Sequence, residues 1–204
     1  MSVFLASIAC NVLDKIVVEL DAQPSDLSVA FVPTASNPSE NKDGTESDRA
    51  KLLELGFRVV DVDIATARHE EILQTMESAD VILVGGGNSF YLLQEARRSG
   101  FDNILGDMIR SGKPYVGSSA GSVLLAPTIE PIKMMDDPKQ APALQSYDGL
   151  ALIDFLPLVH FGNAEFVEEY RQALSDMYSF GPRFVLVRDD EFVMVRDGYW
   201  RICS

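Results

Sequence analysis

Residues 80–88 read DVILVGGGN, an apolar run that ends in three glycines and an asparagine. The four residues from Val81 to Val84 are apolar without alternation, which is typical of a strand covered on both faces, as in a parallel sheet. Residues 184–187, FVLV, have the same character. Because both faces of such strands must be covered, the sequence predicts a sheet lying between two layers of helices.

Short strand-like runs alternate with helix-period stretches along the rest of the chain. The expected strands are Ser2–Ser7, Ser28–Pro33, Phe57–Val62, Asp80–Val84, Pro114–Gly117, Leu158–Phe161, Phe184–Arg188, Phe192–Val195 and Tyr199–Cys203. This alternation predicts a three-layer α/β/α fold with a mostly parallel central sheet. Between the last two runs, Asp197-Gly198 is a strong turn signal and predicts a C-terminal antiparallel hairpin. The 204 residues show no internal repeat, so we expect one domain, residues 1–204.

Composition and charge exclude several classes of protein. Hydrophobic residues make up 47% of the chain, enough for a sizeable core, and the net charge is −14. No cluster of Lys and Arg suited to nucleic acid is visible, and the negative charge disfavours anionic membranes. The cysteines, Cys10 and Cys203, fit neither a disulfide framework nor a zinc motif. With no basic leader and no apolar run of membrane-spanning length, we expect a cytoplasmic protein. We further expect a monomer or a homodimer, without cofactor or metal.

Residues 115–122 read YVGSSAGS and place three serines behind a strand-like run. The pattern G-x-S-x-G between a strand and a helix is that of a nucleophile elbow, whose glycines permit a sharp turn. Only the register Gly117 to Gly121 fits, and it puts Ser119 at the tip. The backbone N–H of Ala120 then lies at a helix N-terminus, where it can stabilise an oxyanion. Ser118 and Ser122 are expected to be packing and helix-start residues.

A serine nucleophile needs a general base, and the chain has two histidines. His69 lies beside Arg68, Glu70 and Glu71, a context typical of a solvated helix face. His160 follows a short apolar run at the expected end of a strand, on the same edge of the sheet as Ser119. A lone histidine there would be read as a core residue, but beside an elbow serine we expect His160 to be the base.

The third member of such a triad is a carboxylate that orients the histidine. Asp189 directly follows the expected strand Phe184–Arg188 and would lie on the same edge of the sheet; Glu191 shares its face, whereas Asp190 points away. Three rivals lie between the serine and the histidine and would give the chain order Ser, Asp, His: Asp136, Asp137 and Asp154. We favour Asp189 because of its position at a strand end.

The glycine triplet has the wrong spacing for a phosphate-binding loop, since neither G-x-G-x-x-G nor G-K-[ST] is present. It follows a neighbouring strand, so its backbone can present an N–H to the point that Ala120 faces. We expect this loop, with Gly86 and Asn88 as further candidate residues, to complete an oxyanion hole. A tight strand-to-helix connection alone would need one glycine and hardly three.

Together, VGGGNSFYLLQEARRSG, GSSAGSVLLAPTI and HFGN resemble the peptidase E (aspartyl dipeptidase) family, which is related to the cyanophycinases. The resemblance covers most of the chain. It implies a fold like that of class I glutamine amidotransferases and flavodoxins, with serine in place of cysteine at the elbow. It also implies Ser119 as nucleophile, His160 as base and the amides of Gly87 and Ala120 as the oxyanion hole.

The same resemblance bears on the acid and on substrate recognition. Asp189 falls where the family places an acidic residue, often Glu, and Asp136 or Asp137 matches a loop aspartate implicated there. The family holds the substrate's Asp side chain with an arginine downstream of the histidine, and Arg171 is the only basic residue between His160 and Arg183. Its spacing from Glu168 equally fits an i,i+3 ion pair on a solvated helix face.

We therefore expect a serine peptidase whose partner is a short peptide substrate: a dipeptide or short peptide, with Asp-Xaa as the substrate class that the resemblance implies. The long proline-bearing loop Pro127–Asp148 is expected to cover the site. The alternatives are a hydrolase of another acyl bond, such as an ester or a cyanophycin-like linkage, and a non-catalytic binding protein. The latter predicts Ser119 and His160 too far apart for a hydrogen bond.

Overall fold

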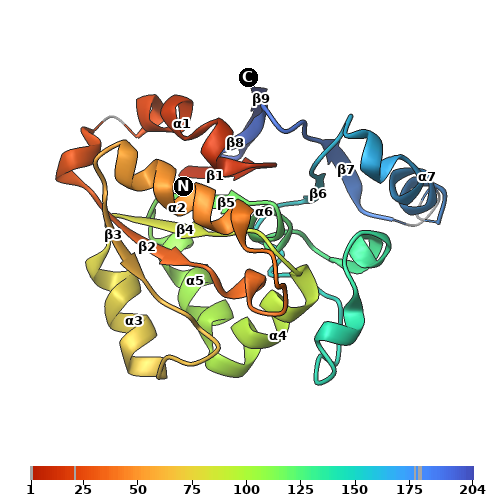
Figure 1. Cartoon of the computed structure of the whole chain (residues 1–204), viewed down its shortest axis with the longest axis horizontal. Coiled ribbons are helices and arrows are strands. Elements are labelled where there is room, and N and C mark those ends of the chain that lie inside the picture. Colours follow the sequence, from red (N-terminus) through yellow and green to blue (C-terminus); the bar gives the residue numbers. More distant parts are fainter. Residues whose placement is uncertain (1, 21, 177, 179–180) are drawn as a thin grey trace.

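The computed structural model describes residues 2–20, 22–176, 178 and 181–204. It contains a seven-stranded sheet with the order β3-β2-β4-β5-β1-β8-β9 (Figure 1). These strands are β1 (Ser2–Ala6), β2 (Ser28–Val32), β3 (Arg58–Asp61), β4 (Val81–Val84), β5 (Tyr115–Ser118), β8 (Phe192–Arg196) and β9 (Tyr199–Cys203). The strands from β3 to β1 run parallel, so the predicted mostly parallel sheet is confirmed.

Helices cover both faces of this sheet. They are α1 (Leu13–Glu19), α2 (Asp43–Glu54), α3 (His69–Ser78), α4 (Ser89–Ser99), α5 (Phe101–Arg110) and α6 (Ala120–Val123). The last helix, α7 (Val167–Asp176), lies away from this sheet (Figure 1). Alternate residues of β4 pack into two different clusters: Val81 and Leu83 contact the side of α1 and α2, and Ile82 and Val84 the side of α3, α4 and α5. The uninterrupted apolar run therefore has the predicted cause, burial on both faces.

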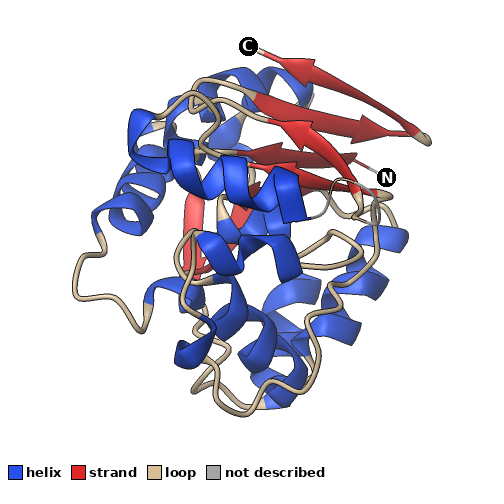
Figure 2. Ribbon diagram, turned by 90° about the vertical axis from the view of Figure 1, so that its right-hand side faces the viewer, coloured by secondary structure: helices blue, strands red, loops and turns tan. Residues whose placement is uncertain are grey.

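The C-terminal hairpin is also as predicted. Strands β8 and β9 pair antiparallel, and β9 forms the outer edge of the sheet (Figure 2). Asp197 and Gly198 both have positive φ, 51° and 82°, as a two-residue type I′ turn requires.

A second, two-stranded parallel sheet departs from the expectation of one sheet. It consists of β6 (Phe155–Leu158) and β7 (Arg183–Leu186) and lies beside α7 (Figure 1). The strand expected at Leu158–Phe161 is thus wrong in its bounds. His160 has φ 65° and Gly162 has φ 89°, and these conformations cannot continue an extended strand. His160 follows the strand end by two residues instead of lying within it.

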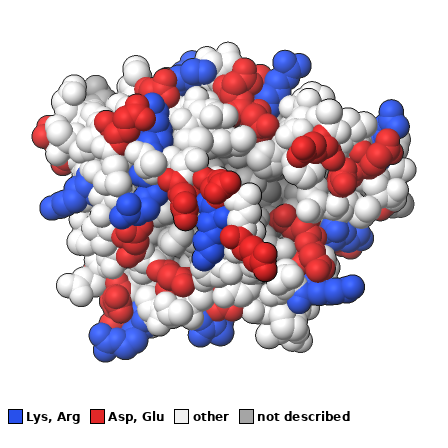
Figure 3. Space-filling model, in the orientation of Figure 1, with Lys and Arg blue, Asp and Glu red and all other residues white. Residues whose placement is uncertain are grey.

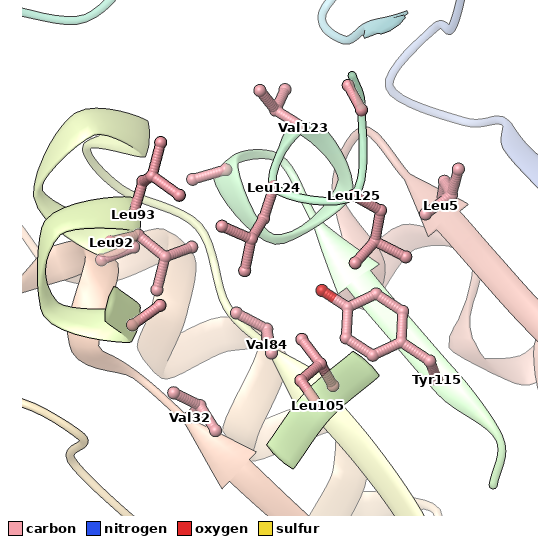
Figure 4. Close-up of a cluster of buried hydrophobic side chains, with 14 of the residues drawn as sticks. Leu5, Val32, Val84, Leu92, Leu93, Leu105, Tyr115, Val123, Leu124 and Leu125 are labelled. Atoms are coloured by element: carbon pink, nitrogen blue, oxygen red, sulfur yellow. The ribbon is translucent and has the colours of Figure 1, made fainter. Parts of the chain in front are cut away.

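The core beneath the elbow is packed with aliphatic side chains from β1, β2, β4, α4, α5 and α6 (Figure 4). Tyr115 is fully buried there, and its hydroxyl donates a 2.6 Å hydrogen bond to the carbonyl oxygen of Gly121. Because β5 and α6 flank Ser119, this bond fastens the strand before the serine to the helix after it. Burial holds the pKa of Tyr115 far above its usual value, so the hydroxyl remains a donor.

Acidic and basic side chains are interspersed on the face shown in Figure 3. Over the described part of the chain, several Arg and Lys side chains form ion pairs, for example Arg49 with Asp61 and Arg98 with Glu95. Among the described residues, no helix is both long and apolar enough to span a membrane.

Candidate active site

The nucleophile elbow lies between β5 and α6, with Ser119 at its tip. Ser119 has φ 48° and ψ −109°, a conformation that non-glycine residues rarely adopt. A Cβ atom at Gly117 would lie 2.6 Å from the backbone nitrogen of Ser122, and one at Gly121 would lie 2.1 Å from the carbonyl oxygen of Val84. Both glycines of the pattern are therefore required by close backbone contacts.

The other two serines of the elbow have structural contacts. The Ser118 hydroxyl accepts a hydrogen bond from the backbone N–H of Ala9, and the Ser122 hydroxyl points to the carbonyl oxygens of Ala6 and Gly117. Both side chains are buried. Ser119, in contrast, is half-buried and lines a cavity.

Ser119, His160 and Asp189 form a continuous chain of hydrogen bonds. The Oγ of Ser119 lies 3.0 Å from Nε2 of His160, and Nδ1 of His160 lies 2.7 Å from Oδ1 of Asp189. A carboxylate accepts only, so Nδ1 carries the proton and Nε2 is left free to accept one from Ser119. Phe166 stacks on the imidazole with a ring-centroid distance of 5.5 Å. The separation expected for a non-catalytic binding protein is not observed.

The rival carboxylates have other partners. Asp136 accepts a 2.8 Å hydrogen bond from the backbone N–H of Ser89, and Asp137 accepts one from the backbone N–H of Lys139. Asp154 forms an exposed ion pair with Arg183. Glu191 accepts from the backbone N–H of Arg188, and Asp190 is exposed.

Asp136 nevertheless lines the same cavity as Ser119 and His160. Its Oδ2 accepts the hydrogen bond from the backbone N–H of Ser89. Burial raises the pKa of Asp136, while its hydrogen bonds with Ser89 and the nearby His160 act in the opposite direction.

The glycine triplet forms the wall opposite His160. Gly87 has φ 137°, and a Cβ there would lie 2.2 Å from the carbonyl oxygen of Ala35, so only glycine fits. The backbone N–H groups of Gly87 and Ala120 donate to no acceptor within the described residues. Asn88 caps α4 by accepting from the N–H of Tyr91 and donates to the carbonyl oxygen of Asp137. A Cβ at Gly86 would lie 3.3 Å from the Cβ of Ser119.

Two cavities adjoin Ser119. The loop-side cavity, of about 450 Å³, is lined by Ile132, Met135 and Asp136 of the long loop, together with His160 and Phe166. That loop, Pro127–Asp148, contains two short 3₁₀ helices, Glu130–Met134 and Pro138–Gln140. It therefore forms one wall of the site, in keeping with its expected position over it.

The α2-side cavity, of about 440 Å³, lies on the other side of Ser119 and is lined by residues around the start of α2, among them Asn41, Lys42 and Thr45. Gly86, Gly87 and Ser119 also line it. The two cavities together make a cleft with Ser119 at its centre.

Arg171 lies on α7 and forms a 3.0 Å ion pair with Glu168. Its side chain is 73% exposed, and neither cavity beside Ser119 is lined by it. Of the two interpretations of Arg171, the structure therefore supports the ion pair on a solvated helix face. Within the described residues, no group of three or more His, Cys, Asp or Glu side chains is placed to hold a metal ion.

Ser7 and Asp48 are site residues that the sequence did not reveal. Ser7 follows β1 and contacts both His160 and Asp189. Asp48 of α2 is 2% exposed and accepts a 2.8 Å hydrogen bond from the backbone N–H of Cys10, behind the elbow. Neither residue belongs to a sequence motif, and their partners are distant in the chain. The only available signal was that Ser7 ends a strand of the same sheet as Ser119.

Asp48 gives rise to a testable pH dependence, because burial raises its pKa in the folded protein. As pH rises above the ordinary carboxyl value, the unfolded chain releases its proton first, so the stability contributed by protonated Asp48 is lost as pH passes through the raised pKa. We expect Asp48→Asn, which cannot ionise, to gain stability relative to wild type between pH 4 and pH 7. Urea denaturation of both proteins at pH 4 and pH 7 measures this. If the difference in free energy of unfolding between variant and wild type were the same at both pH values, the raised pKa of Asp48 would be contradicted.

Comparison with known proteins agrees with this geometry. Residues 8–203 match the model of peptidase family S51. The chain is 37% identical over 179 residues to an uncharacterized peptidase of Listeria innocua, Lin0382, covering 88% of this chain and 85% of that protein. It is 34% identical over 139 residues to peptidase E of Shigella flexneri, covering 67% of this chain and 56% of that protein.

A solved structure supports the same assignment across the whole chain. It comes from Listeria monocytogenes EGD-e and is described as that of a peptidase E protein. It superposes with a TM-score of 0.92 at 33% identity, covering 99% of this chain and 97% of the other. The chain that carries this elbow serine and its histidine partner thus matches the family over almost all its length. The protein belongs to peptidase family S51 and is a serine-type peptidase.

Proposed function

We propose that this peptidase hydrolyses dipeptides and short peptides, with Ser119 as nucleophile, His160 as general base and Asp189 as the carboxylate that orients His160. The observation that carries the proposal is the hydrogen-bond chain from Ser119 Oγ through both ring nitrogens of His160 to Asp189. Without such a base a serine hydroxyl is a weak nucleophile.

In the proposed reaction, Ser119 Oγ attacks the scissile carbonyl carbon while Nε2 of His160 takes its proton. The unoccupied amides of Gly87 and Ala120 stabilise the oxyanion of the tetrahedral intermediate. His160 then donates the proton to the leaving amine, and an acyl group remains on Ser119. Water, activated by the same imidazole, releases the acyl group and restores the serine.

The charges around the cleft support a short substrate with a free amino group. Asp136 presents a carboxylate to the loop-side cavity, and no Lys or Arg lines that cavity within the described residues. An α-ammonium group of the substrate is the natural partner for this carboxylate. On the other side of Ser119, the α2-side cavity is lined by Lys42 together with Asp43 and the buried Asp48, and Lys42 is the side chain there that suits the carboxylate of the leaving residue.

The test is hydrolysis of a dipeptide panel by wild type and by Ser119→Ala. We expect free Ala-Xaa and Gly-Xaa dipeptides to be cleaved at least as well as Asp-Xaa, because Arg171 is engaged with Glu168 away from the cleft. N-acetylation removes the ammonium partner of Asp136 and is expected to lower kcat/KM by about 10-fold or more. Cleavage of esters but of no peptide would refute the proposed function, and equal cleavage of acetylated dipeptides would refute the role of Asp136.

A further inference from the structure

The end of β1 and the segment after it, residues 6–11, contact every member of the proposed triad. The backbone N–H of Ser119 donates to the carbonyl oxygen of Ala6 at 3.1 Å. Ser7 contacts both His160 and Asp189, and the side-chain amide of Asn11 donates to the carbonyl oxygen of Asp189 at 2.9 Å. One short segment thus connects three residues that are far apart in the sequence.

Ser7 makes the most specific of these contacts. Its Oγ donates to Oδ1 of Asp189 at 2.6 Å and accepts from the backbone N–H of His160 at 2.7 Å. The same oxygen lies 3.2 Å from Nδ1 of His160. The Ser7 side chain is fully buried, so no solvent competes for these hydrogen bonds.

The two-sheet architecture explains why such a contact matters. Ser119 extends from the seven-stranded sheet, whereas His160 and Asp189 follow β6 and β7 of the separate sheet. Within the described residues, every hydrogen bond that joins residues 155–191 to residues 2–123 involves Ser7, Asn11 or Ser119 itself. The ladder of β8 with β1 begins at Phe192, three residues after Asp189, but among the described residues no strand ladder joins β6, which precedes His160, to the seven-stranded sheet.

The backbone of His160 gives a second reason. Its φ of 65° is unfavourable for a residue with a side chain and persists only where the surroundings hold it. The Ser7 hydroxyl accepts the N–H of this strained residue and also bonds to the carboxylate that holds its ring. The Oγ of Ser7 thus holds the backbone of His160 directly and its imidazole through Asp189.

We propose that Ser7 is a positioning residue of the catalytic site, which holds the His160–Asp189 pair of one sheet in register with Ser119 of the other. This inference rests on the roles proposed above for the three residues. Ser7 borders the α2-side cavity, but it is fully buried and its hydroxyl is engaged with Asp189 and His160. It acts through Asp189, whose Oδ1 receives two donors, and through the backbone of His160. A shift of about 1 Å in a catalytic group can lower turnover about 100-fold.

Three variants test the proposal: Ser7→Ala, Ser7→Thr, which keeps the hydroxyl, and Ser28→Ala as a matched control. Ser28 is 2% exposed and its Oγ donates to Asp80 at 2.7 Å, so the control loses the same kind of bond in another part of the protein. We measure kcat and KM on a free dipeptide, the free energy of unfolding, and the downfield proton NMR signal of the His160 Nδ1–H.

We expect Ser7→Ala to lower kcat about 100-fold with KM little changed, and to shift or broaden the downfield signal. Ser7→Thr restores most of kcat, and Ser28→Ala loses stability while keeping wild-type kcat and the signal. The role of Ser7 is overturned if Ser7→Ala keeps the wild-type kcat. It is also overturned if Ser28→Ala lowers kcat as much as Ser7→Ala does. The proposed function fails separately, if wild type cleaves no dipeptide or if Ser119→Ala retains activity.

Discussion

Ser119→Ala is expected to lower kcat for dipeptide hydrolysis by at least about 10⁴-fold while the protein remains folded. The hydroxyl that attacks the carbonyl is lost, and the backbone amides of the oxyanion hole can supply only a small remainder of the catalysis. Alanine adds no atom to the elbow and keeps the Cβ that the backbone there already carries. The measurement is steady-state hydrolysis, with labelling by a fluorophosphonate as a second readout that depends on Oγ directly.

Ser122→Ala is the matched control for this prediction. Ser122 is fully buried three residues further on, and its hydroxyl points to Ala6 and Gly117 instead of into the cleft. We expect this variant to lose about 1 kcal/mol of stability and to keep its fluorophosphonate labelling. If Ser119→Ala hydrolysed dipeptides as wild type does, or if only Ser122→Ala abolished labelling, the assignment of the nucleophile would be wrong.

The elbow could be located from sequence because its requirements are local. Gly117 is needed by a close contact with Ser122 within the elbow and Gly121 by one with Val84 of the adjacent strand β4, and a strand must precede the turn. These constraints produce the five-residue sequence pattern G-x-S-x-G. The same holds for the hairpin turn at Asp197-Gly198, whose positive φ angles favour this pair of residues. The uninterrupted apolar run of β4 likewise indicated a strand buried on both faces.

Contacts between distant segments could not be read in this way. His160 was expected to end a strand of one continuous sheet, yet it follows a strand of a second sheet and reaches Ser119 only because the two sheets meet there. Ser7 is 153 residues from His160 and 182 from Asp189, and no periodicity connects them. Arg171 illustrates the opposite case, since a resemblance suggested a binding role while the nearby Glu168 indicated its actual partner.

Asp189→Asn is expected to lower kcat by about 10⁴-fold, the second large effect. Asparagine keeps the size of the side chain, but its amide group can donate to Nδ1 of His160. The imidazole then carries its proton on Nε2, where it can no longer accept the proton of Ser119. Substrate binding is not expected to change, because Asp189 lines neither cavity beside Ser119. The effect should therefore fall on kcat, with KM within a few-fold of wild type.

Asp136→Asn is the variant that distinguishes the two candidate acids. The asparagine oxygen can still accept the N–H of Ser89, so the loop keeps its anchor, but the negative charge in the loop-side cavity is lost. We expect KM for free dipeptides to rise about 10-fold or more, with kcat retained within a few-fold and N-acetylated substrates unaffected. The reverse pattern, with kcat lost in Asp136→Asn and kept in Asp189→Asn, would place the catalytic carboxylate on the loop. Kinetics of both variants on one free and one acetylated dipeptide separate these outcomes. Loss of the carboxylate that orients the imidazole of His160 lowers kcat, whereas loss of the carboxylate that binds the substrate's ammonium group raises KM.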